Sequence, residues 1–581
     1  MEVKDMKQSA DFKEMRANYD AIFGKGPADL LIKNARIVDV YSNRVRPGSI
    51  LINGGKIVAI DPDESKVHPK EVMDAENRYV APGFIDAHCH IDSHLVTPAA
   101  FSQAIVPNGT TTLICEIEDY VGACKKDGVW ATEVLFSHLD KLPYNLYLQA
   151  PGKKVKWDIA REILKMDACI NQGEFPELDA LEGKDEVFEQ VAFAKSIGKE
   201  IHSHSKYLDE DPYPVNMFAM MGSYNTHNVW DYTSLEQALR LGLNPMLREG
   251  VDSVLSCMEA AVPEMVNNHL PTDTVMLCTD NLTVDTIFRR GHLNYNMNRA
   301  IGFGISPIEA IRMGTLNAAR SFKLDQIVGS VAPGRYADLV FLDTLQVIQP
   351  VMVMKNGRIV ARDGELLEYP QIDYSKIIRT PKPGLDGLKR EDFKLEPIEI
   401  SADGKQAKLV ALYMGMPAYL GEYWFPYENG KVVVPEDMRY LTVIERYPRN
   451  GKPRKIINGL VSQYNMKTGA VASVYASLAP QICVVGENYD DMFAAAKALD
   501  QYDGGYLSVK DGKVTSVLPC EIFSTISTLT AKEFNERTKE LRAAGEAIGY
   551  HEEDSRCPWQ FRLQIMSWML DRRRYVDLEE D

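Results

Sequence analysis

Residues 81–98 read APGFIDAHCHIDSHLVTP and carry an unusual concentration of histidine. Three of the chain's eleven histidines, His88, His90 and His94, stand here within seven residues, after an apolar run that ends at Asp86. Residues two apart on a β-strand point to the same face, so the imidazoles of His88 and His90 can reach one metal ion. Neutral imidazole binds divalent transition metals well. The pattern indicates a metal site at a strand end, although histidines exposed in a loop would give the same letters.

The composition is that of an ordinary globular protein. The chain has 581 residues, of which 45% are hydrophobic and 25% charged, and this length predicts two to four domains. The formal net charge of −17 argues against a nucleic-acid backbone or an anionic membrane as partner. A nucleobase carries no phosphate and is not excluded as a substrate.

The sequence also bears on the compartment. No stretch offers the ~18 uninterrupted apolar residues of a membrane helix, and the charged N-terminus lacks the apolar centre of a secretory signal. The nine cysteines are scattered without a C-x-x-C pair, which is typical of reduced thiols rather than a disulfide scaffold. We therefore expect a cytoplasmic protein with no membrane partner.

Two strand-rich segments flank the middle of the chain. Residues 33–40, KNARIVDV, resemble residues 355–362, KNGRIVAR, and both lie among Ile- and Val-rich runs with Asn-Gly or Gly-Gly turns. Such runs predict β-hairpins. We expect residues 1–85, which begin with a polar helix, and residues 333–395 to form one small β-sandwich domain.

The segment between these two, residues 86–332, alternates short apolar runs with amphipathic helical patterns. This alternation predicts a parallel sheet, and the length is typical of a (β/α)₈ barrel, whose catalytic groups lie at the carboxyl ends of its strands. Residues 396–581 read as a further α+β domain. The predicted fold class is α/β, with a TIM barrel inserted in the small β-domain.

Histidines and an acid follow the later strands of the predicted barrel. His204 ends KEIHSH, with His202 two residues earlier and either beside it or facing outward; His227 stands in SYNTHNVWD. Asp280 follows the apolar run of TVMLCTDN. A carboxylate there is costly unless it is paired or binds a metal, and the alternative is an N-cap for the helix that follows.

The order H-x-H, His, His, Asp on successive strands resembles the amidohydrolase superfamily. More narrowly, the chain resembles the bacterial-type adenine deaminase family almost from end to end. The segments that carry this resemblance are VTPAAFSQAIVPNGTTT, MLREG, LCTDN, GHLNYNMNRAI, RMGTLNAAR, GSVAPGRYADLVFLD, ICVVGENYDDMFAAAKAL and GGYLSVKDGKV. The resemblance implies a TIM barrel, a role in purine metabolism and a hydrolase acting on carbon–nitrogen bonds other than peptide bonds. Members of the superfamily commonly form homo-oligomers.

Several positions depart from that family. Its Asp-Pro-His-Glu run is replaced by residues 116–119, EIED, so that Glu116 and Glu118 are expected to share a strand face at the barrel mouth or to form an exposed polar strand end. Asn171 stands where the family has a glutamate that bridges two metals. Glu174, three residues on, would substitute for it only if the loop bends.

Further departures lie around the expected substrate pocket. His94 replaces a serine and Asp92 a glutamate, while the C-terminal His-Asp-Ser-His segment becomes SLAPQIC, residues 477–483. These changes place the substrate and the number of metal ions in question, and we expect His94 to form part of a pocket wall rather than to bind metal.

Without a bridging acid, the resemblance favours one tightly held ion with an open position for water, bound by His88, His90, His204 and Asp280. Further candidate ligands are His227 and Glu118, which leaves one or two ions. Nitrogen and carboxylate donors suit manganese, iron or zinc.

Four residues are candidates for catalysis. We expect Asp280 to take a proton from water and His227 to orient the hydroxide or the substrate. Glu174 and Glu249 are candidate proton carriers, and the alternative for Glu249 is a salt bridge to an arginine such as Arg248.

The function predicted from these residues is hydrolytic deamination of an adenine-like purine base, with attack by a metal-bound hydroxide and release of ammonia. Two alternatives remain: opening of a cyclic amide or ureide in a related heterocycle, and a non-catalytic relative that only binds a ligand. The H-x-E and P-C-x-x-C pattern of zinc deaminases and the G-x-S-x-G elbow of serine hydrolases are absent from the sequence.

Overall fold

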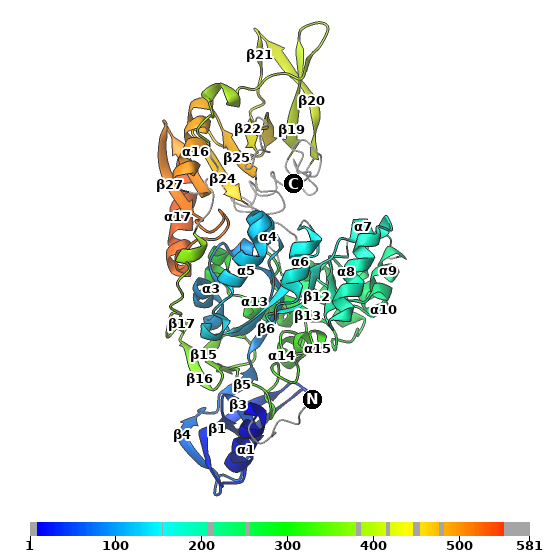
Figure 1. Ribbon diagram of the computed structural model, residues 1–581, viewed down its shortest axis with the longest axis vertical. Helices are drawn as coiled ribbons and strands as arrows, with labels where there is room; N and C mark the ends of the chain where they lie inside the picture. The colour runs from blue at the N-terminus through cyan, green and yellow to red at the C-terminus, as the bar shows by residue number, and fades with distance from the viewer. Residues whose placement is uncertain are drawn as a thin grey trace.

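The computed structural model describes residues 9–550 except for 154, 206–207, 209–210, 212, 250–255, 379–384, 414–418, 446–453, 476–480 and 503. Its strands form three sheets. The first sheet and the last lie at opposite ends of the molecule, with the barrel between them (Figure 1).

The first sheet joins segments from both sides of the barrel. Leu339 lies opposite Pro82 where β14 pairs antiparallel with β5, so the chain leaves this sheet, builds the barrel and returns. Helix α1 (Ala10–Ile22), capped by the Ser9 side chain, packs against it. The strands are β1 (Pro27–Asp39), β2 (Arg44–Asn53), β3 (Lys56–Ile60), β4 (His68–Asp74), β5 (Tyr79–Pro82), β14 (Leu339–Leu342), β15 (Pro350–Lys355), β16 (Arg358–Arg362) and β17 (Glu365–Leu366).

The second sheet is a parallel barrel of eight strands in sequence order. It closes where Cys89 bridges Asp280, with the backbone N–H of Asp280 donating to the carbonyl of His88 at 2.9 Å. The expected TIM barrel is thus confirmed. Its strands are β6 (Phe84–His90), β7 (Thr110–Glu116), β8 (Asn145–Ala150), β9 (Cys169–Glu174), β10 (Glu200–Ser203), β11 (Ser223–Thr226), β12 (Asn244–Arg248) and β13 (Met276–Cys278).

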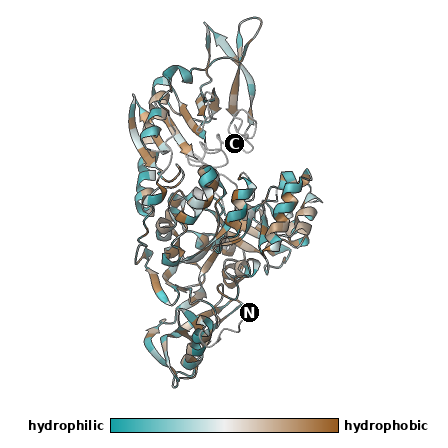
Figure 2. Cartoon of the chain, in the orientation of Figure 1, coloured by the Kyte–Doolittle hydropathy of each residue, from teal (hydrophilic) through white to brown (hydrophobic). Residues whose placement is uncertain are grey.

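Helices surround the barrel (Figure 1), and their polar residues are drawn in teal and their apolar residues in brown (Figure 2). Side-chain caps fix where several of them begin; Asp231 and Ser234, for example, form a capping box on α10. The helices are α2 (Ile91–His94), α3 (Pro98–Ile105), α4 (Glu118–Cys124), α5 (Gly128–Leu135), α6 (Trp157–Leu164), α7 (Glu177–Leu181), α8 (Asp185–Ser196), α9 (Tyr213–Met221), α10 (Tyr232–Arg240), α11 (Cys257–Asn267), α12 (Val284–Arg290), α13 (Leu293–Gly302), α14 (Pro307–Met313) and α15 (Leu316–Ser321).

The third sheet, with two helices, forms the C-terminal α+β part. It is joined to the barrel by the N–H of Ser527, which donates to the Leu95 carbonyl at 2.8 Å, and by Arg542, which pairs with Asp285 at 2.9 Å. Its elements are β18 (Glu399–Ile400), β19 (Gln406–Tyr413), β20 (Tyr419–Glu428), β21 (Lys431–Val432), β22 (Met438–Ile444), β23 (Ile456–Ser462), β24 (Ala470–Tyr475), β25 (Gln481–Gly486), β26 (Gly505–Lys510), β27 (Lys513–Pro519), α16 (Tyr489–Gln501) and α17 (Ala531–Ala547).

Within the described part of the chain, every cysteine is buried as a free thiol, as the scattered spacing predicted. None of the helices described there combines the length and the apolar character needed to span a bilayer.

Candidate metal centre

The barrel brings the predicted ligands together at one mouth. His88 and His90 stand on β6, His204 and His227 directly follow β10 and β11, and Asp280 lies two residues after β13. Because the strands are parallel, their carboxyl ends open on the same face of the barrel. Residues that are far apart in the sequence therefore lie close together at this face.

The cluster contains three groups of metal-type ligands: a first of His88, His90 and Asp280, a second of Glu174, His204 and His227, and a third of His88, His202 and His227 that shares two members with the others. In the first group the Nε2 atoms of His88 and His90 lie 3.2 Å apart, and Asp280 Oδ1 lies 3.4 Å from His90 Nε2. In the second group His204 Nδ1 faces His227 Nε2 at 2.8 Å. Ring nitrogens that face one another at such short distances repel through their lone pairs. A cation between them, bound by these lone pairs, suits the arrangement better than direct contact.

Glu174 connects the first two groups. Its Oε1 atom lies 3.2 Å from His204 Nδ1 and 3.3 Å from His227 Nε2, the second group. The same oxygen lies 3.7 Å from His90 Nε2 and 3.8 Å from His88 Nε2, the first group. One carboxylate oxygen is therefore within reach of both groups.

This placement corrects the expectation drawn from Asn171. No bend in a loop is needed to bring Glu174 to the site, because β9 continues to Glu174 as its last residue. Asn171 lies within that strand, buried, and its amide donates to the Gln172 carbonyl at 3.2 Å. A carboxylate is therefore present at the site although Asn171 does not supply it, and the number of ions stays a prediction.

Glu174 is held by two further groups. Lys153 Nζ lies 2.5 Å from its Oε2, and Oε1 of Glu116 accepts its backbone N–H at 2.7 Å. Burial acts to raise the pKa of Glu174, but His204 and Lys153 outweigh it and leave the pKa well below its usual range. Burial raises the pKa of Glu116, and the neighbouring carboxylates of Glu174 and Glu118 raise it further.

Asp280 is fixed from the opposite side. Its Oδ2 pairs with the buried Arg248 guanidinium, which lies 4.7 Å from the Trp230 ring centroid. Burial opposes ionisation of Asp280, yet Arg248, His90 and His227 together outweigh it and hold the pKa well below its usual range. The φ of +57° is rare for aspartate and is typical of functional sites. Thr283, not Asp280, caps α12.

Two candidates lie outside these groups. Glu118 is the first residue of α4, not part of a strand beside Glu116, and its Oε2 accepts from the Lys153 N–H at 3.3 Å. Glu249 forms a salt bridge, as the alternative supposed, but with Arg299, whose Nε donates to it at 2.9 Å. Their roles as ligand and proton carrier stay predictions.

The pocket wall predicted at Asp92, His94 and residues 477–483 lies partly within the described residues. The His94 ring is buried and stacks on Phe101 with centroids 3.7 Å apart, and neither of its ring nitrogens has a hydrogen-bond partner. It belongs to none of the metal groups. The Asp92 side chain and residues 477–480 of the SLAPQIC segment lie outside the described residues.

An amide orients the first ligand. The Oε1 atom of Gln149 can only accept, so the Nδ1–H of His88 donates to it, at 3.2 Å, and leaves Nε2 unprotonated for a metal. Partners of this kind commonly fix metal-binding histidines. With three nitrogen or oxygen donors in each group, the residues present fit a divalent transition metal.

Lys153, Gln149 and Arg248 hold the ligands from behind, and none of them was predicted to lie at the metal site. Gln149 lies in β8, Lys153 lies in the segment that follows β8, and Arg248 is the last residue of β12. A charged or amide side chain at a barrel strand end is the signal that would have found all three.

Gly173 gives a direct test of how Glu174 is held. A Cβ atom at this position would lie 2.0 Å from Glu116 Oε1, so the Gly173→Ala variant must displace Glu116 from the Glu174 backbone. We expect a loss of about 1–3 kcal/mol of stability together with reduced activity, measured by thermal unfolding and turnover. Gly122→Ala in α4 is the control, because its Cβ meets nothing within 4 Å; equal losses in both would contradict the account.

Comparisons with known proteins agree with this geometry. Residues 194–362 match the model of the amidohydrolase family, and residues 421–561 match the adenine deaminase C-terminal domain. An adenine deaminase of Desulforamulus reducens is 34% identical over 549 residues, with 90% of each chain covered. Adenine deaminase 1 of Latilactobacillus sakei is 30% identical, with 90% of this chain and 89% of that one covered.

Among solved structures, the chain is similar to a zinc-bound adenosine deaminase from Xanthomonas campestris at 15% identity. The TM-score is 0.44, and 60% of this chain and 96% of that one are covered.

The barrel mouth with its two ligand groups, the matched C-terminal domain and the relatives that align over nine-tenths of their length lead to one conclusion. The chain belongs to the adenine deaminase family of amidohydrolases.

Proposed function

We propose that the protein is a metal-dependent hydrolase that deaminates adenine and releases ammonia. The observation that carries the proposal is the position of Glu174 Oε1 between two groups of metal-type ligands at the barrel mouth. The relatives that align with nearly the whole chain are adenine deaminases, which supports adenine as the substrate.

The two groups would hold one divalent ion each. His88, His90 and Asp280 form one site and His204 and His227 the other, with Glu174 shared between them. When bound, such ions lower the pKa of water toward neutrality and so supply a nucleophile at physiological pH. Nitrogen and carboxylate donors support manganese, iron or zinc.

The chain's own residues position the reaction and handle its protons. Arg248 holds Oδ2 of Asp280, so Oδ1 is the oxygen that faces the histidines and can accept a proton from water. Deamination also needs a proton delivered to the departing amino group, because ammonia leaves more readily than its anion. A carboxyl group that takes the proton at Oδ1 and returns it to that nitrogen completes the hydrolysis without a net change in the enzyme.

Opening of a cyclic amide or ureide is the second candidate. It is favoured by His94, which stands where the family has a serine and has two unpartnered ring nitrogens in a buried position. A changed wall of this kind changes which heterocycle fits. In either case we propose a small heterocyclic substrate, a cytoplasmic homo-oligomer and no nucleic-acid partner.

An ammonia assay over a panel of purines, pyrimidines and cyclic ureides separates these candidates. Ammonia equimolar with the 6-oxo purine, formed from adenine, is the expected result. Loss of ring absorbance without stoichiometric ammonia would replace the proposal with ring opening. No turnover of any compound by the metal-loaded protein would leave only ligand binding.

Removal of the metal is expected to abolish turnover and to lower the midpoint of thermal unfolding. A bound ion would hold the six crowded ligand groups together, and an ion present at 100 times its Kd stabilises the folded state by about 2.7 kcal/mol. Treatment with a chelator, followed by dialysis and calorimetry, measures the shift. Adding manganese should restore both properties; turnover that persists in the chelated, metal-free protein would contradict the proposal.

A further inference from the structure

His202 lies directly behind His227 and does not face the centre of the metal site. Its Nε2 lies 2.9 Å from His227 Nδ1, and its Nδ1 bonds to Asn225 Oδ1. All three side chains are buried. Asn225 in turn donates to Ser321 Oγ at 3.3 Å, so a continuous line of hydrogen bonds runs from the barrel interior to His227.

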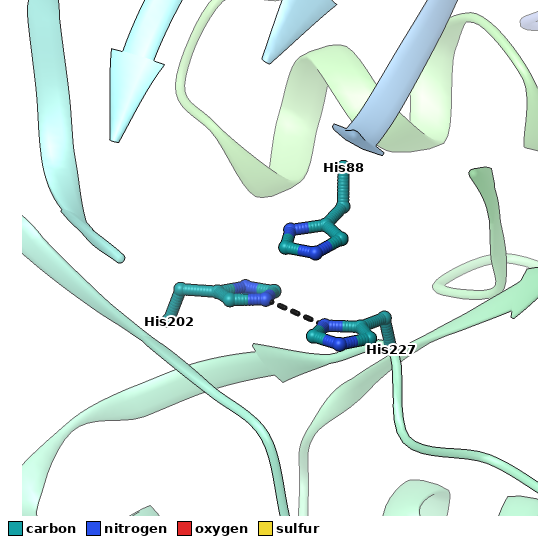
Figure 3. Close-up of side chains that lie close together, drawn as sticks. All are labelled: His88, His202 and His227. Atoms are coloured by element: carbon teal, nitrogen blue, oxygen red, sulfur yellow. Dashed lines mark hydrogen bonds between the residues drawn. The ribbon is translucent and has the colours of Figure 1, made fainter. Parts of the chain in front are cut away.

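His202 could join His88 and His227 around an ion, but the ring orientations and the hydrogen bonds of His202 favour a different role. The His202 and His227 rings are nearly coplanar, at 6°, and meet edge to edge, while the His88 ring lies flat over His227 at 3.9 Å (Figure 3). Imidazole lone pairs lie in the ring plane, so stacked rings cannot direct them at one ion. Both nitrogens of His202 are already engaged, by His227 and by Asn225.

The hydrogen bonds determine which nitrogen of each ring carries the proton. An amide oxygen only accepts, so the proton of neutral His202 is on Nδ1 and its Nε2 must accept. The bond to Nε2 then comes from the Nδ1–H of His227. This leaves His227 Nε2 unprotonated, and Nε2 is the atom that lies 2.8 Å from His204 Nδ1 and 3.3 Å from Glu174 Oε1.

We propose that His202 and Asn225 are positioning residues that fix the ring plane and the tautomer of His227, so that its Nε2 is preformed as a metal ligand. The inference rests on the proposed function, since it concerns the second ligand group of that site. It assigns to His202 a purpose other than metal binding, and to Asn225 a purpose other than packing in the barrel.

Three variants test this line of bonds. Asn225→Leu keeps the size of the side chain but removes the oxygen that accepts the His202 hydrogen bond. Asn225→Asp keeps an accepting oxygen, and its carboxylate has no N–H to donate. The Ser321 hydroxyl can turn to donate to the new carboxylate, so the aspartate variant loses no partner. Asn244→Leu is the matched control, because Asn244 donates to the same Ser321 Oγ, at 3.1 Å, but does not bond to His202.

The first measurement is the affinity of each variant for Mn²⁺, titrated into metal-free protein against a competing chelator. Removing an outer partner of a metal-binding histidine costs about 10–100-fold in affinity. We expect this loss in Asn225→Leu for one of the two ions only, near-normal affinities in Asn225→Asp and in Asn244→Leu, and similar unfolding midpoints in the two leucine variants.

The second measurement needs neither metal nor substrate. Nitrogen chemical shifts of ¹⁵N-histidine in the metal-free wild-type protein report the tautomer of each ring, and His227→Gln assigns the His227 signal. We expect the Nδ1–H tautomer for His227 in the wild type and in Asn225→Asp, and a mixture of tautomers in Asn225→Leu.

These results separate the inference from the proposed function. If Asn225→Leu keeps both affinities and the tautomer, or if Asn225→Asp loses them as severely as the leucine variant, the inference is overturned even when the wild type deaminates adenine. If the tautomers follow the prediction while the wild type releases no ammonia from adenine, the proposed function fails and the positioning role stands.

Discussion

Asp280→Asn is expected to lower the rate of ammonia release from adenine by about 10²–10⁴-fold, the range that general acid–base groups contribute. Asparagine keeps the shape of the side chain but cannot accept a proton from water at Oδ1, the oxygen that faces His90 at 3.4 Å. It also offers a weaker ligand than a carboxylate. Turnover with saturating manganese, so that metal binding does not limit the rate, is the measurement.

Asp280→Asn should also destabilise the protein, and a double variant separates this loss of stability from the loss of turnover. Asp280 neutralises the buried Arg248, and removing one partner of a buried ion pair costs about 3–5 kcal/mol because the other charge is left unpaired. The double variant Asp280→Asn with Arg248→Met removes that charge. We expect it to regain thermal stability but not turnover; recovery of turnover with stability would show that Asp280 acts only through the fold.

Glu174→Gln is expected to weaken the binding of both metal ions, by more than about 100-fold, because residues that only orient a ligand are already worth about 10–100-fold. A neutral amide cannot balance the charge of two cations at once. Metal content after dialysis, together with turnover, measures the effect. A variant at His204 or His90 should instead weaken mainly the ion of its own group.

Glu177→Gln is the matched control for this change. Glu177 is also buried and lies three residues further on, as the first residue of α7, but it belongs to neither ligand group. It should keep both ions and most of the turnover. If Glu174→Gln also keeps both ions, Glu174 is not the shared ligand, and the assignment of two connected groups is wrong.

The architecture was largely predictable because its signals are local and repeated. Alternating strands and helices predicted the barrel, and similar hairpins on both sides predicted that the chain returns to the first sheet. The residues His88, His90, His227 and Asp280 were predictable for a related reason. A parallel barrel places every strand end at one mouth, so a histidine or acid at a strand end needs no further information to be assigned there.

Glu174 was predicted as a proton carrier, but its place between the two ligand groups was not. A strand has a side-chain period of two, so the face of a residue depends on where the strand ends and on any irregularity of register. The pairing of β9 with β10 has such an irregularity, next to His202 and Glu174. A comparison position by position therefore selected Asn171, whereas the strand continues and delivers the carboxylate three residues later.

The partners of the residues behind the ligands were not predictable from the sequence. Arg248 pairs with Asp280, Gln149 with His88 and Asn225 with His202, and each pair joins different strands through side chains. Spacing along one strand contains no information about such contacts. They depend on the register between neighbouring strands, which only the folded barrel fixes.

The most direct test is to add manganese to the metal-free protein and to measure ammonia release from adenine as a function of the ions bound per chain. Two ligand groups that share Glu174 predict that turnover rises until two equivalents are bound and then stays constant. Full turnover at one equivalent would contradict the shared site, and turnover without any metal would contradict the account as a whole.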